Sequence, residues 1–247
     1  MKSKNKLKLF LQGFIMINVL WYILAIIVDM RVLPTPMSVY LNLNNLYDNR
    51  LHIHILASLY RVVCGVGISL VLGLFIGLLM AYSKTWNKVL NPLVYFTYPV
   101  PKTALLPVVM LLFGLGDASK IIIIVLILVF QVIIGVRDAV LNISPETYNP
   151  IRSLGASRQQ IFRHITLPAI LPELLTNLRL SIGTALSILF FAEAYGTQLG
   201  IGYYILDAWT RIDYIGMYAG IIVISLFGFI LFVLTDMLEE ALCKWKA

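Results

Sequence analysis

The chain has 247 residues, of which 60% are hydrophobic and only 13% charged. A soluble domain usually carries about 25% charged residues, and one water-soluble core of this size is an implausible place for so much apolar surface, so an ordinary soluble protein is excluded. The net charge of +7 comes from short clusters of lysine and arginine between apolar runs, as in membrane-protein loops, and does not indicate nucleic-acid binding.

Two apolar runs open the chain. Residues 9–28 contain no Asp, Glu, Lys or Arg and are long enough to span a bilayer, which takes about 20 residues. A cleaved signal peptide is the competing interpretation, but the run ends in Ile26-Ile27-Val28-Asp29 and lacks an A-x-A-like site, so we predict a retained helix. Residues 29–55 are polar and predict an external loop. Residues 62–83 predict a second span, in which Gly73-x-x-x-Gly77 would let another helix approach closely.

A third span is predicted over residues 89–116, after a short loop marked by Lys84 and Lys88. Proline removes a backbone donor and kinks a helix, so Pro99, Pro101 and Pro107 predict that this span is bent or interrupted. A turn at residues 113–120 then leads into a fourth span over about 119–140.

The second half of the chain begins with a polar stretch at residues 141–168. A fifth span is expected over about 170–192, followed by a loop at 193–213 and a sixth span over 214–236. A short charged tail ends the chain. Together these segments predict an all-α membrane protein with about six transmembrane helices.

The distribution of loop lysines and arginines predicts the orientation, because cytoplasmic loops carry an excess of these residues. With the N-terminus inside, the outer segments hold only Arg31, Arg50, Lys120 and Arg211. Both chain termini are therefore predicted to lie in the cytoplasm. The inner segments hold Lys2, Lys4, Lys6, Lys8, Lys84, Lys88, Arg137, Arg152, Arg158, Arg163, Lys244 and Lys246.

The polar stretch between the fourth and fifth spans is too long for a simple turn. Ser144-Pro145 and Asn149-Pro150 each pair a helix-capping residue with proline, so Pro150 is expected to start or kink a helix. Apolar residues then recur at helical spacing, with an interruption at Gly155, which predicts a pair of short amphipathic helices. From the residues alone, these helices could face lipid phosphates or form a docking surface.

The same stretch resembles the EAA loop of ABC importer permeases. Ser153-Leu-Gly-Ala-Ser157 supplies the glycine; nine residues separate Gly155 from Ile165, and one more residue precedes Leu167-Pro168. The family's Glu-Ala-Ala would fall on Asn149, Pro150 and Ile151, so the acidic residue is absent there, and Glu146 lies three residues earlier. In the family this loop forms the coupling helix that sits in a groove of the cytoplasmic ATPase.

Further segments are similar to the nitrate/sulfonate/taurine branch of these permeases. They are Leu33-Pro-Thr-Pro36, Pro99-Val-Pro-Lys-Thr-Ala-Leu-Leu-Pro107, Phe113-Gly-Leu-Gly116 with Ser119-Lys120, and Ala192-Glu193 followed by Gly200-Ile-Gly-Tyr203. The resemblance implies a type I importer fold, with residues 1–247 as one transmembrane permease domain and a coupling loop at about 142–168. It also implies import of a small anionic solute through the cell membrane.

The resemblance implies partners and a division of labour. Two copies of a cytoplasmic ATPase would bind the ATP and Mg²⁺, so this chain would hold no cofactor and catalyse nothing. An external binding protein would deliver the solute, and a second permease copy would complete a homodimer around the pathway. The residues expected to contact the ATPase are Arg152, Leu154, Gly155, Ala156, Ser157, Ile165, Leu167 and Pro168.

Charged residues inside a membrane are costly and mark functional positions by default. Lys102, Arg179 and Glu193 are therefore candidates for the solute pathway, with snorkelling, a structural ion pair and a position at the outer rim as their respective alternatives. Arg61 lies near a predicted helix end, so we expect its side chain to snorkel towards the interface.

Other classes of function find little support. The chain has no GxxxxGK[ST] phosphate loop, HExxH or GxSxG motif, His52-x-His54 lacks an obvious third ligand, and Cys64 and Cys243 have no metal or disulfide spacing, so no metal site is predicted. The main alternative is a secondary transporter driven by an ion gradient, which the broken third span and the intramembrane charges would fit. An intramembrane enzyme would need a paired catalytic set.

Overall fold

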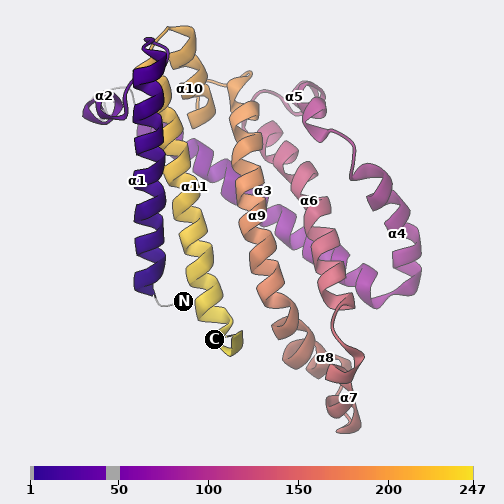
Figure 1. The fold of residues 1–247 in the computed structure, drawn as a ribbon. Coiled ribbons are helices and arrows are strands. Elements are labelled where there is room, and N and C mark those ends of the chain that lie inside the picture. Colours follow the sequence, from indigo (N-terminus) through magenta and orange to yellow (C-terminus); the bar gives the residue numbers. More distant parts are fainter. Residues whose placement is uncertain (1–2, 43–50, 247) are drawn as a thin grey trace.

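The computed structural model describes residues 3–42 and 51–246, and within these ranges every regular element is a helix. Lys2 and Arg50, two of the residues used to predict the orientation, lie outside the described part of the chain. Five long helices dominate the bundle (Figure 1): α1 (Ser3–Val28), α3 (Leu51–Tyr82), α6 (Asp117–Leu141), α9 (Leu167–Ala194) and α11 (Tyr214–Leu242).

Each of these five helices contains a stretch long and apolar enough to cross a membrane. A sixth span is obtained when the bent pair at Lys84–Thr97 and Lys102–Phe113 is counted as one, because its two arms meet at 82°. The prediction of about six spans with an interrupted third one is confirmed.

The interrupted span consists of α4 (Lys84–Thr97), a 3₁₀ turn η2 (Lys102–Leu105) and α5 (Leu106–Phe113). The break falls at Pro99 and Pro101, where the chain loses two backbone donors in close succession. Figure 1 shows α4 and α5 bowing away from α6 as an arch. The arch carries large exposed apolar side chains, including Tyr95, Phe96 and Leu111.

The centre of the bundle is the close pair of α3 and α6. A Cβ atom added to Gly73 would lie 2.6 Å from Cβ of Val132, and one added to Gly77 would lie 2.7 Å from Cβ of Val136. The two helices thus touch along a glycine groove of α3 into which the branched side chains of α6 fit. The close approach predicted from Gly73-x-x-x-Gly77 is confirmed.

Two segments predicted as loops contain helices. The stretch 29–55 includes α2 (Pro36–Leu41), capped by the Thr35 hydroxyl, and the first turn of α3. The stretch 193–213 includes α10 (Ile201–Thr210). Its buried residues are Ile201, Tyr204, Ile205 and Ala208, with Gly202, so it folds because an apolar stripe packs on α9 and α11.

The ends of the chain also differ from the prediction. α11 continues through the charged residues at 236–240 as far as Leu242, so the expected tail is largely helical. α1 packs against α11 through two aromatic contacts, Phe10 on Phe229 at 4.0 Å and Trp21 on Tyr218 at 5.4 Å between ring centroids. In Figure 1 both termini lie towards the end of the bundle where α7 (Pro145–Ser153) and α8 (Arg158–Ile161) project, opposite α2, α5 and α10.

Candidate functional site: the α7–α8 turn and the buried charges

The segment between α6 and α9 projects from one end of the bundle as two short helices, α7 (Pro145–Ser153) and α8 (Arg158–Ile161) (Figure 1). α7 begins as predicted, with the Ser144 hydroxyl accepting a hydrogen bond from the Glu146 amide and Pro145 in the first helical position. Pro150 lies inside α7, so the Asn149-Pro150 pair does not start a helix.

The turn from α7 to α8, residues 154–157, is held by hydrogen bonds on both sides. Gly155 adopts φ of +75°, its amide donates to Arg152 O at 3.0 Å, and the Ala156 amide donates to Ile151 O at 3.2 Å. This pair of bonds is the Schellman ending of a helix, which places a left-handed residue where glycine is favoured. Gly155 is therefore required by the backbone of the turn itself.

α8 starts immediately after this ending. The Ser157 amide donates to Gln160 Oε1 at 2.7 Å, and the Gln160 amide donates to Ser157 Oγ at 3.3 Å. This reciprocal pair is a capping box, and it fixes the first turn of α8. Because one helix ends and the next begins within four residues, the turn is a defined shape, and Leu154 stands at its apex with 84% of its surface exposed.

The eight residues expected to contact the ATPase fall into two groups. Arg152, Leu154, Gly155, Ala156 and Ser157 form or flank the turn, with the Arg152 guanidinium 5.2 Å from the centre of the Tyr148 ring. Ile165, Leu167 and Pro168 lie further along, where a π-helical turn η3 (Phe162–Thr166) runs into α9, and they are half-buried. The first group is the exposed tip, and the second joins that tip to α9.

The three pathway candidates do not come together. Lys102 is 8% exposed, and its ammonium donates to Thr97 O, Tyr98 O and Val100 O at 2.8, 3.0 and 3.4 Å, beside the Phe130 ring. Arg179 of α9 pairs with Asp236 and Glu239 of α11. Lys102 thus serves the bend of the third span, and Arg179 ties two helices.

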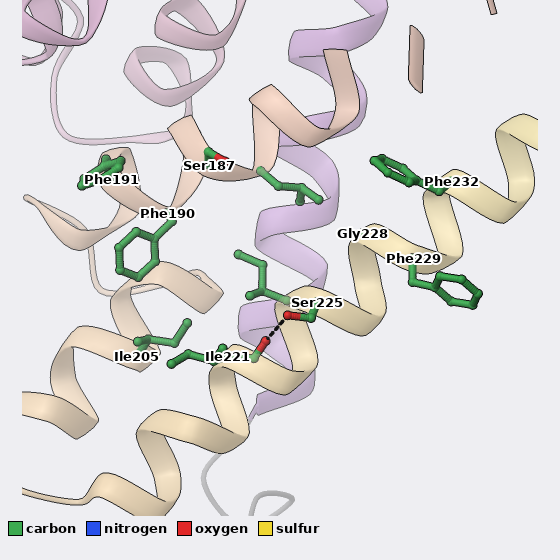
Figure 2. Close-up of a pocket in the computed structure, with 11 residues that line it drawn as sticks. Ser187, Phe190, Phe191, Ile205, Ile221, Ser225, Gly228, Phe229 and Phe232 are labelled. Carbon is green, nitrogen blue, oxygen red and sulfur yellow. Dashed lines mark hydrogen bonds between the residues drawn. The ribbon is translucent and has the colours of Figure 1, made fainter. Parts of the chain in front are cut away.

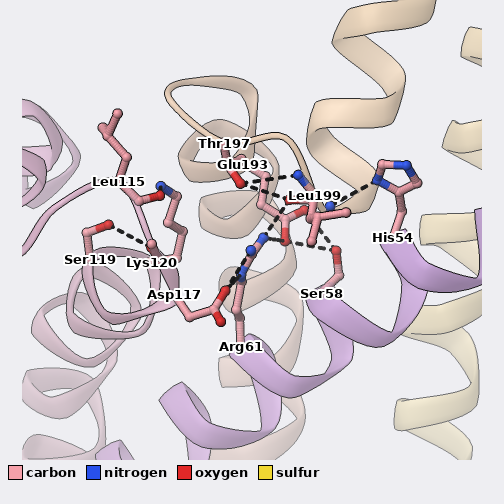
Figure 3. Close-up of polar contacts among 12 residues, drawn as sticks. His54, Ser58, Arg61, Leu115, Asp117, Ser119, Lys120, Glu193, Thr197 and Leu199 are labelled. Atoms are coloured by element: carbon pink, nitrogen blue, oxygen red, sulfur yellow. Dashed lines mark hydrogen bonds and ion pairs between the residues drawn. The ribbon is translucent and has the colours of Figure 1, made fainter.

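Glu193, the third candidate, lies near the end of α9, at the end of the bundle opposite the α7–α8 turn (Figure 1). It belongs to a junction of polar side chains (Figure 3). Its side chain is fully buried and accepts hydrogen bonds from Arg61 Nη1 at 2.6 Å, from the Ser58 hydroxyl at 2.8 and 2.9 Å, and from the Gly202 amide at 3.0 Å. Glu193 thus lies at one end of the bundle, but its side chain is enclosed by α3 and the turn before α10 and is not exposed there.

The prediction that Arg61 snorkels is wrong. α3 begins ten residues earlier, at Leu51, so Arg61 lies within the helix and is only 3% exposed. Besides Glu193, its guanidinium binds Asp117 Oδ1 through Nε and Nη2, both at 2.7 Å, and Leu199 O at 2.8 Å. One side chain thus links α3, α6, α9 and the turn before α10.

Two further residues complete this region. His54 Nδ1 accepts a hydrogen bond from the Gly200 amide at 3.1 Å, so this nitrogen is engaged with the backbone. Lys120, which the sequence suggested belongs to an outer turn, is in the first turn of α6, fully buried, and donates to Leu115 O at 2.6 Å (Figure 3). In the sequence, this junction could have been found from the charged residues at positions 61, 117, 120 and 193, which all lie at or near the ends of predicted apolar spans.

An apolar groove runs between α9, α10 and α11 (Figure 2). Phenylalanines 190, 191, 229 and 232 line it, and its two hydroxyls are used within their own helices, Ser187 donating to Gly183 O and Ser225 to Ile221 O. Such a surface suits lipid chains or another helix, and it offers a small anion no free donor.

The fold and the α7–α8 turn can now be compared with known proteins. The family described as the binding-protein-dependent transport system inner membrane component matches residues 69–243, most of the chain and all of the segment that carries the turn. The chain belongs to this family. It is thus a multi-pass inner-membrane permease of an ABC importer, and the resemblance stated from the sequence is confirmed.

Curated relatives match the permease over nearly its whole length. It is 33% identical to the putative aliphatic sulfonates transport permease protein SsuC of Bacillus subtilis, over 89% of this chain and 80% of that protein. It is 30% identical to the taurine transport system permease protein TauC of Escherichia coli, over 94% and 86%. The formylaminopyrimidine transport permease protein ThiX of Halalkalibacterium halodurans is 28% identical, over 94% of both chains.

Solved structures show the same architecture. A chain of a bacterial alginate ABC transporter, crystallised with a pentasaccharide-bound periplasmic protein, superposes with a TM-score of 0.65 at 16% identity, covering 98% of both chains. A chain of the inward-facing methionine transporter MetNI gives 0.65 at 19% identity and covers 78% of the permease. At these identities the likeness shows the fold, that of a type I importer transmembrane domain.

Proposed function

We propose that this permease imports a small anionic solute of the nitrate, sulfonate or taurine kind, driven by ATP that a separate ATPase binds with Mg²⁺ and hydrolyses. The relatives named for sulfonates and taurine support this solute class. The chain itself would catalyse no reaction and hold no cofactor. Family membership implies an ATPase and a binding protein as partners.

The observation that carries the proposal is the geometry of the α7–α8 turn. Two hydrogen-bonded caps meet within four residues and hold Leu154 outward, 84% exposed, at the tip of the molecule. A large apolar side chain held outward on a projecting turn gains about 1.5–3 kcal/mol when a hydrophobic groove of a partner buries it. We assign the tip, residues 152–157, to the ATPase contact, with Ile165, Leu167 and Pro168 passing its movement to α9.

The proposed orientation puts both termini and the tip in the cytoplasm. Figure 1 supports this, because the termini lie towards the end where α7 and α8 project. Lysines and arginines gather at the same end, including Lys84 at the start of α4 and Arg152 and Arg158 beside the turn. The buried junction of Arg61 and Glu193 would then lie near the external side.

The complete importer would contain two copies each of the permease and the ATPase, and residues 1–247 would act as one transmembrane domain. The exposed aromatic and leucine side chains on α4 and α5, among them Tyr95, Phe96 and Leu111, would suit contact with the second copy. A pathway role for Lys102, Arg179 and Glu193 stays a prediction; each of them also has the structural partners described above. The ion-gradient alternative is not favoured, because it gives the α7–α8 turn no task.

The test is co-purification of the ABC ATPase encoded beside the permease, in detergent, with wild type and with Gly155→Glu. Gly155 and Gly114 both have left-handed φ and open space where a Cβ would be added, and they lie at opposite ends of the bundle. Gly114→Glu is therefore a matched control. Loss of the ATPase from Gly155→Glu alone supports the docking assignment. Equal binding by both variants, or no ATPase bound by wild type, contradicts it.

A further inference from the structure

Helices α3 and α9 are joined by polar side-chain contacts at both ends, and the two joints differ in kind. At the end away from the α7–α8 turn, the joint is the Arg61–Glu193 ion pair. At the end beside the turn, the Tyr82 hydroxyl donates to Thr166 Oγ1 at 2.7 Å. α9 has 28 residues and so extends for roughly 42 Å, which means that the two joints act at opposite ends of one long rod.

The Arg61–Glu193 joint is buried and fully bonded. The two side chains are 3% and 0% exposed, and the hydrogen bonds of their charged groups are charge-assisted, the strong class. Removing Arg61 would leave the buried Glu193 carboxylate without its cation, which is far more costly than losing a surface contact. The same carboxylate also accepts from Ser58 and Gly202, so parting α9 from α3 here would break several bonds at once.

The backbone around Glu193 leaves no room for sliding. A Cβ atom added to Gly200 would lie 2.2 Å from the carboxyl carbon of Glu193, and one added to Gly202 would lie 2.6 Å from Phe190 O. The half of α9 near this joint also packs in the largest apolar cluster, where Ala185, Ile188 and Leu189 contact α3 and α6. The ion pair, the close packing of the backbone and the apolar cluster therefore all hold the Glu193 end of α9 in place.

The other joint is weaker. Tyr82 is 57% exposed, and its hydrogen bond to Thr166 is between two neutral hydroxyls, with the Tyr148 hydroxyl 3.3 Å from the same Oγ1. A neutral hydrogen bond contributes about 0.5–1.5 kcal/mol net, less than a hydrogen bond to a charged group. A cavity lies beside it, lined by Leu78 and Tyr82 of α3 and by Ile161 and Phe162 across from them. Thr166 itself is fully buried, and an apolar cluster around Ala139, Val140 and Ile170 packs here, smaller than the cluster near Glu193. Because this end has the smaller core and, among the described residues, no buried ion pair between α3 and α9, it is the end that can shift.

We propose that the Arg61–Glu193 pair is the fixed end of α9, a positioning pair about which the helix tilts when the α7–α8 turn is moved. Under this arrangement α9 swings relative to α3 at Thr166, and the Tyr82–Thr166 hydrogen bond is exchanged for water during the cycle. The junction around Glu193 keeps its contacts throughout. The proposal rests on the assignment of the turn to the ATPase, and it adds which end of the helix stays still.

The experiment compares two pairs of cysteines, one for each end, in a background with Cys64 and Cys243 replaced by alanine. Ile53→Cys with Gln198→Cys reports on the fixed end, because both residues line one open cavity beside His54. Leu78→Cys with Ile161→Cys reports on the other end across the cavity there. Cross-linking by a short bifunctional thiol reagent is timed in the permease–ATPase complex, without nucleotide and after trapping with ATP and vanadate.

We expect the rate for the 53/198 pair to change by less than twofold on trapping and the rate for the 78/161 pair to change at least fivefold. Glu193→Gln should make the 53/198 pair sensitive to nucleotide, whereas Arg179→Gln, which removes a different ion pair of α9, should not. Three results would overturn the proposal. The first is a large change in the 53/198 rate on trapping when Glu193 is present, and the second is an unchanged 78/161 rate. The third is a 53/198 rate that stays insensitive to nucleotide in Glu193→Gln.

Two features keep the result interpretable. If Glu193→Gln fails to fold, as judged by monodispersity in detergent, the comparison of the two pairs without that substitution still decides. If the ATPase does not bind the permease at all, the docking assignment fails by co-purification, and this outcome is distinct from a complex that forms but moves at the wrong end.

Discussion

The ammonium nitrogen of Lys102 lies 2.8 Å from the carbonyl oxygen of Thr97, the last residue of α4. The last carbonyls of a helix lack intrahelical donors and carry partial negative charge, so a buried cation at this place both bonds and neutralises them. Lys102 follows the break itself, and its ammonium lies 5.0 Å from the centre of the Phe130 ring. The bend of the third span is thus capped by a side chain from its own second arm.

Replacing Lys102 by methionine should destabilise the permease. The substitution keeps the apolar stem and removes the donors to three carbonyls, so we expect a loss of about 1–3 kcal/mol, typical of hydrogen bonds to charged groups. Thermal unfolding in detergent measures the loss. Lys88→Met, an exposed position on α4, should leave the midpoint unchanged. A Lys102→Met protein that unfolds like wild type but no longer transports would instead support the pathway role.

Two glycines of α3 should respond to alanine with opposite signs. Gly73→Ala inserts a methyl group 2.6 Å from Val132, so α3 and α6 must part, at a cost of about 1–3 kcal/mol. Gly67 has nothing within 4 Å of its added Cβ, so Gly67→Ala should stabilise the helix by about 0.5–1 kcal/mol. Chemical denaturation in mixed micelles gives both values, and equal shifts would contradict the close contact of α3 and α6.

Substituting Gly155 by alanine and by asparagine distinguishes the effect of backbone strain on ATPase docking from the effect of side-chain size. Alanine in the left-handed conformation costs about 1–2 kcal/mol, whereas asparagine visits this region more readily. If strain of the turn governs docking, Gly155→Ala should weaken ATPase affinity more than Gly155→Asn, by roughly 5- to 30-fold for alanine. If the ATPase approaches the glycine closely, the larger asparagine should be the worse of the two. Titration of the ATPase onto immobilised permease distinguishes these results.

Ser157→Ala tests whether the start of α8 must be fixed before docking. Loss of an N-cap costs about 1 kcal/mol and leaves the Gln160 amide without its partner. We expect faster amide hydrogen exchange confined to residues 158–161 and a modest loss of ATPase affinity. Ser153→Ala is the control, because the Ser153 hydroxyl bonds only to Asn149 O within α7. Exchange that is unchanged in Ser157→Ala would show that packing, and not the cap, holds α8.

The spans were accessible from the sequence because each depends on local composition. Runs of some 20 apolar residues and a cluster of prolines are sufficient to predict five long helices and one bent one. α10 was missed because its length of ten residues is too short for a span and its first residues follow a glycine turn. Its apolar stripe at 201, 204, 205 and 208 does have helical spacing, so this signal was present.

The buried junction could not be read in the same way. Arg61 and Glu193 are separated by 132 positions in the sequence, and no local pattern specifies which charge meets which. A single charged residue within an apolar run predicts only that some partner exists. Assigning that partner requires the packing of α3 against α9, in which Val62 and Val66 of α3 share one apolar cluster with Ile188 and Leu189 of α9.

The π-helical turn η3 separates α8 from α9 and has a geometric consequence of its own. A π turn holds about one residue more than an α turn, so the helix that follows is rotated by about 100° relative to an uninterrupted one. The turn at Phe162–Thr166 therefore determines the direction, measured as a rotation about the axis of α9, in which Leu154 points. Deleting one residue there would rotate the tip, residues 152–157, without altering any side chain on it. The length of this five-residue turn therefore determines the orientation in which the permease presents the tip to the ATPase.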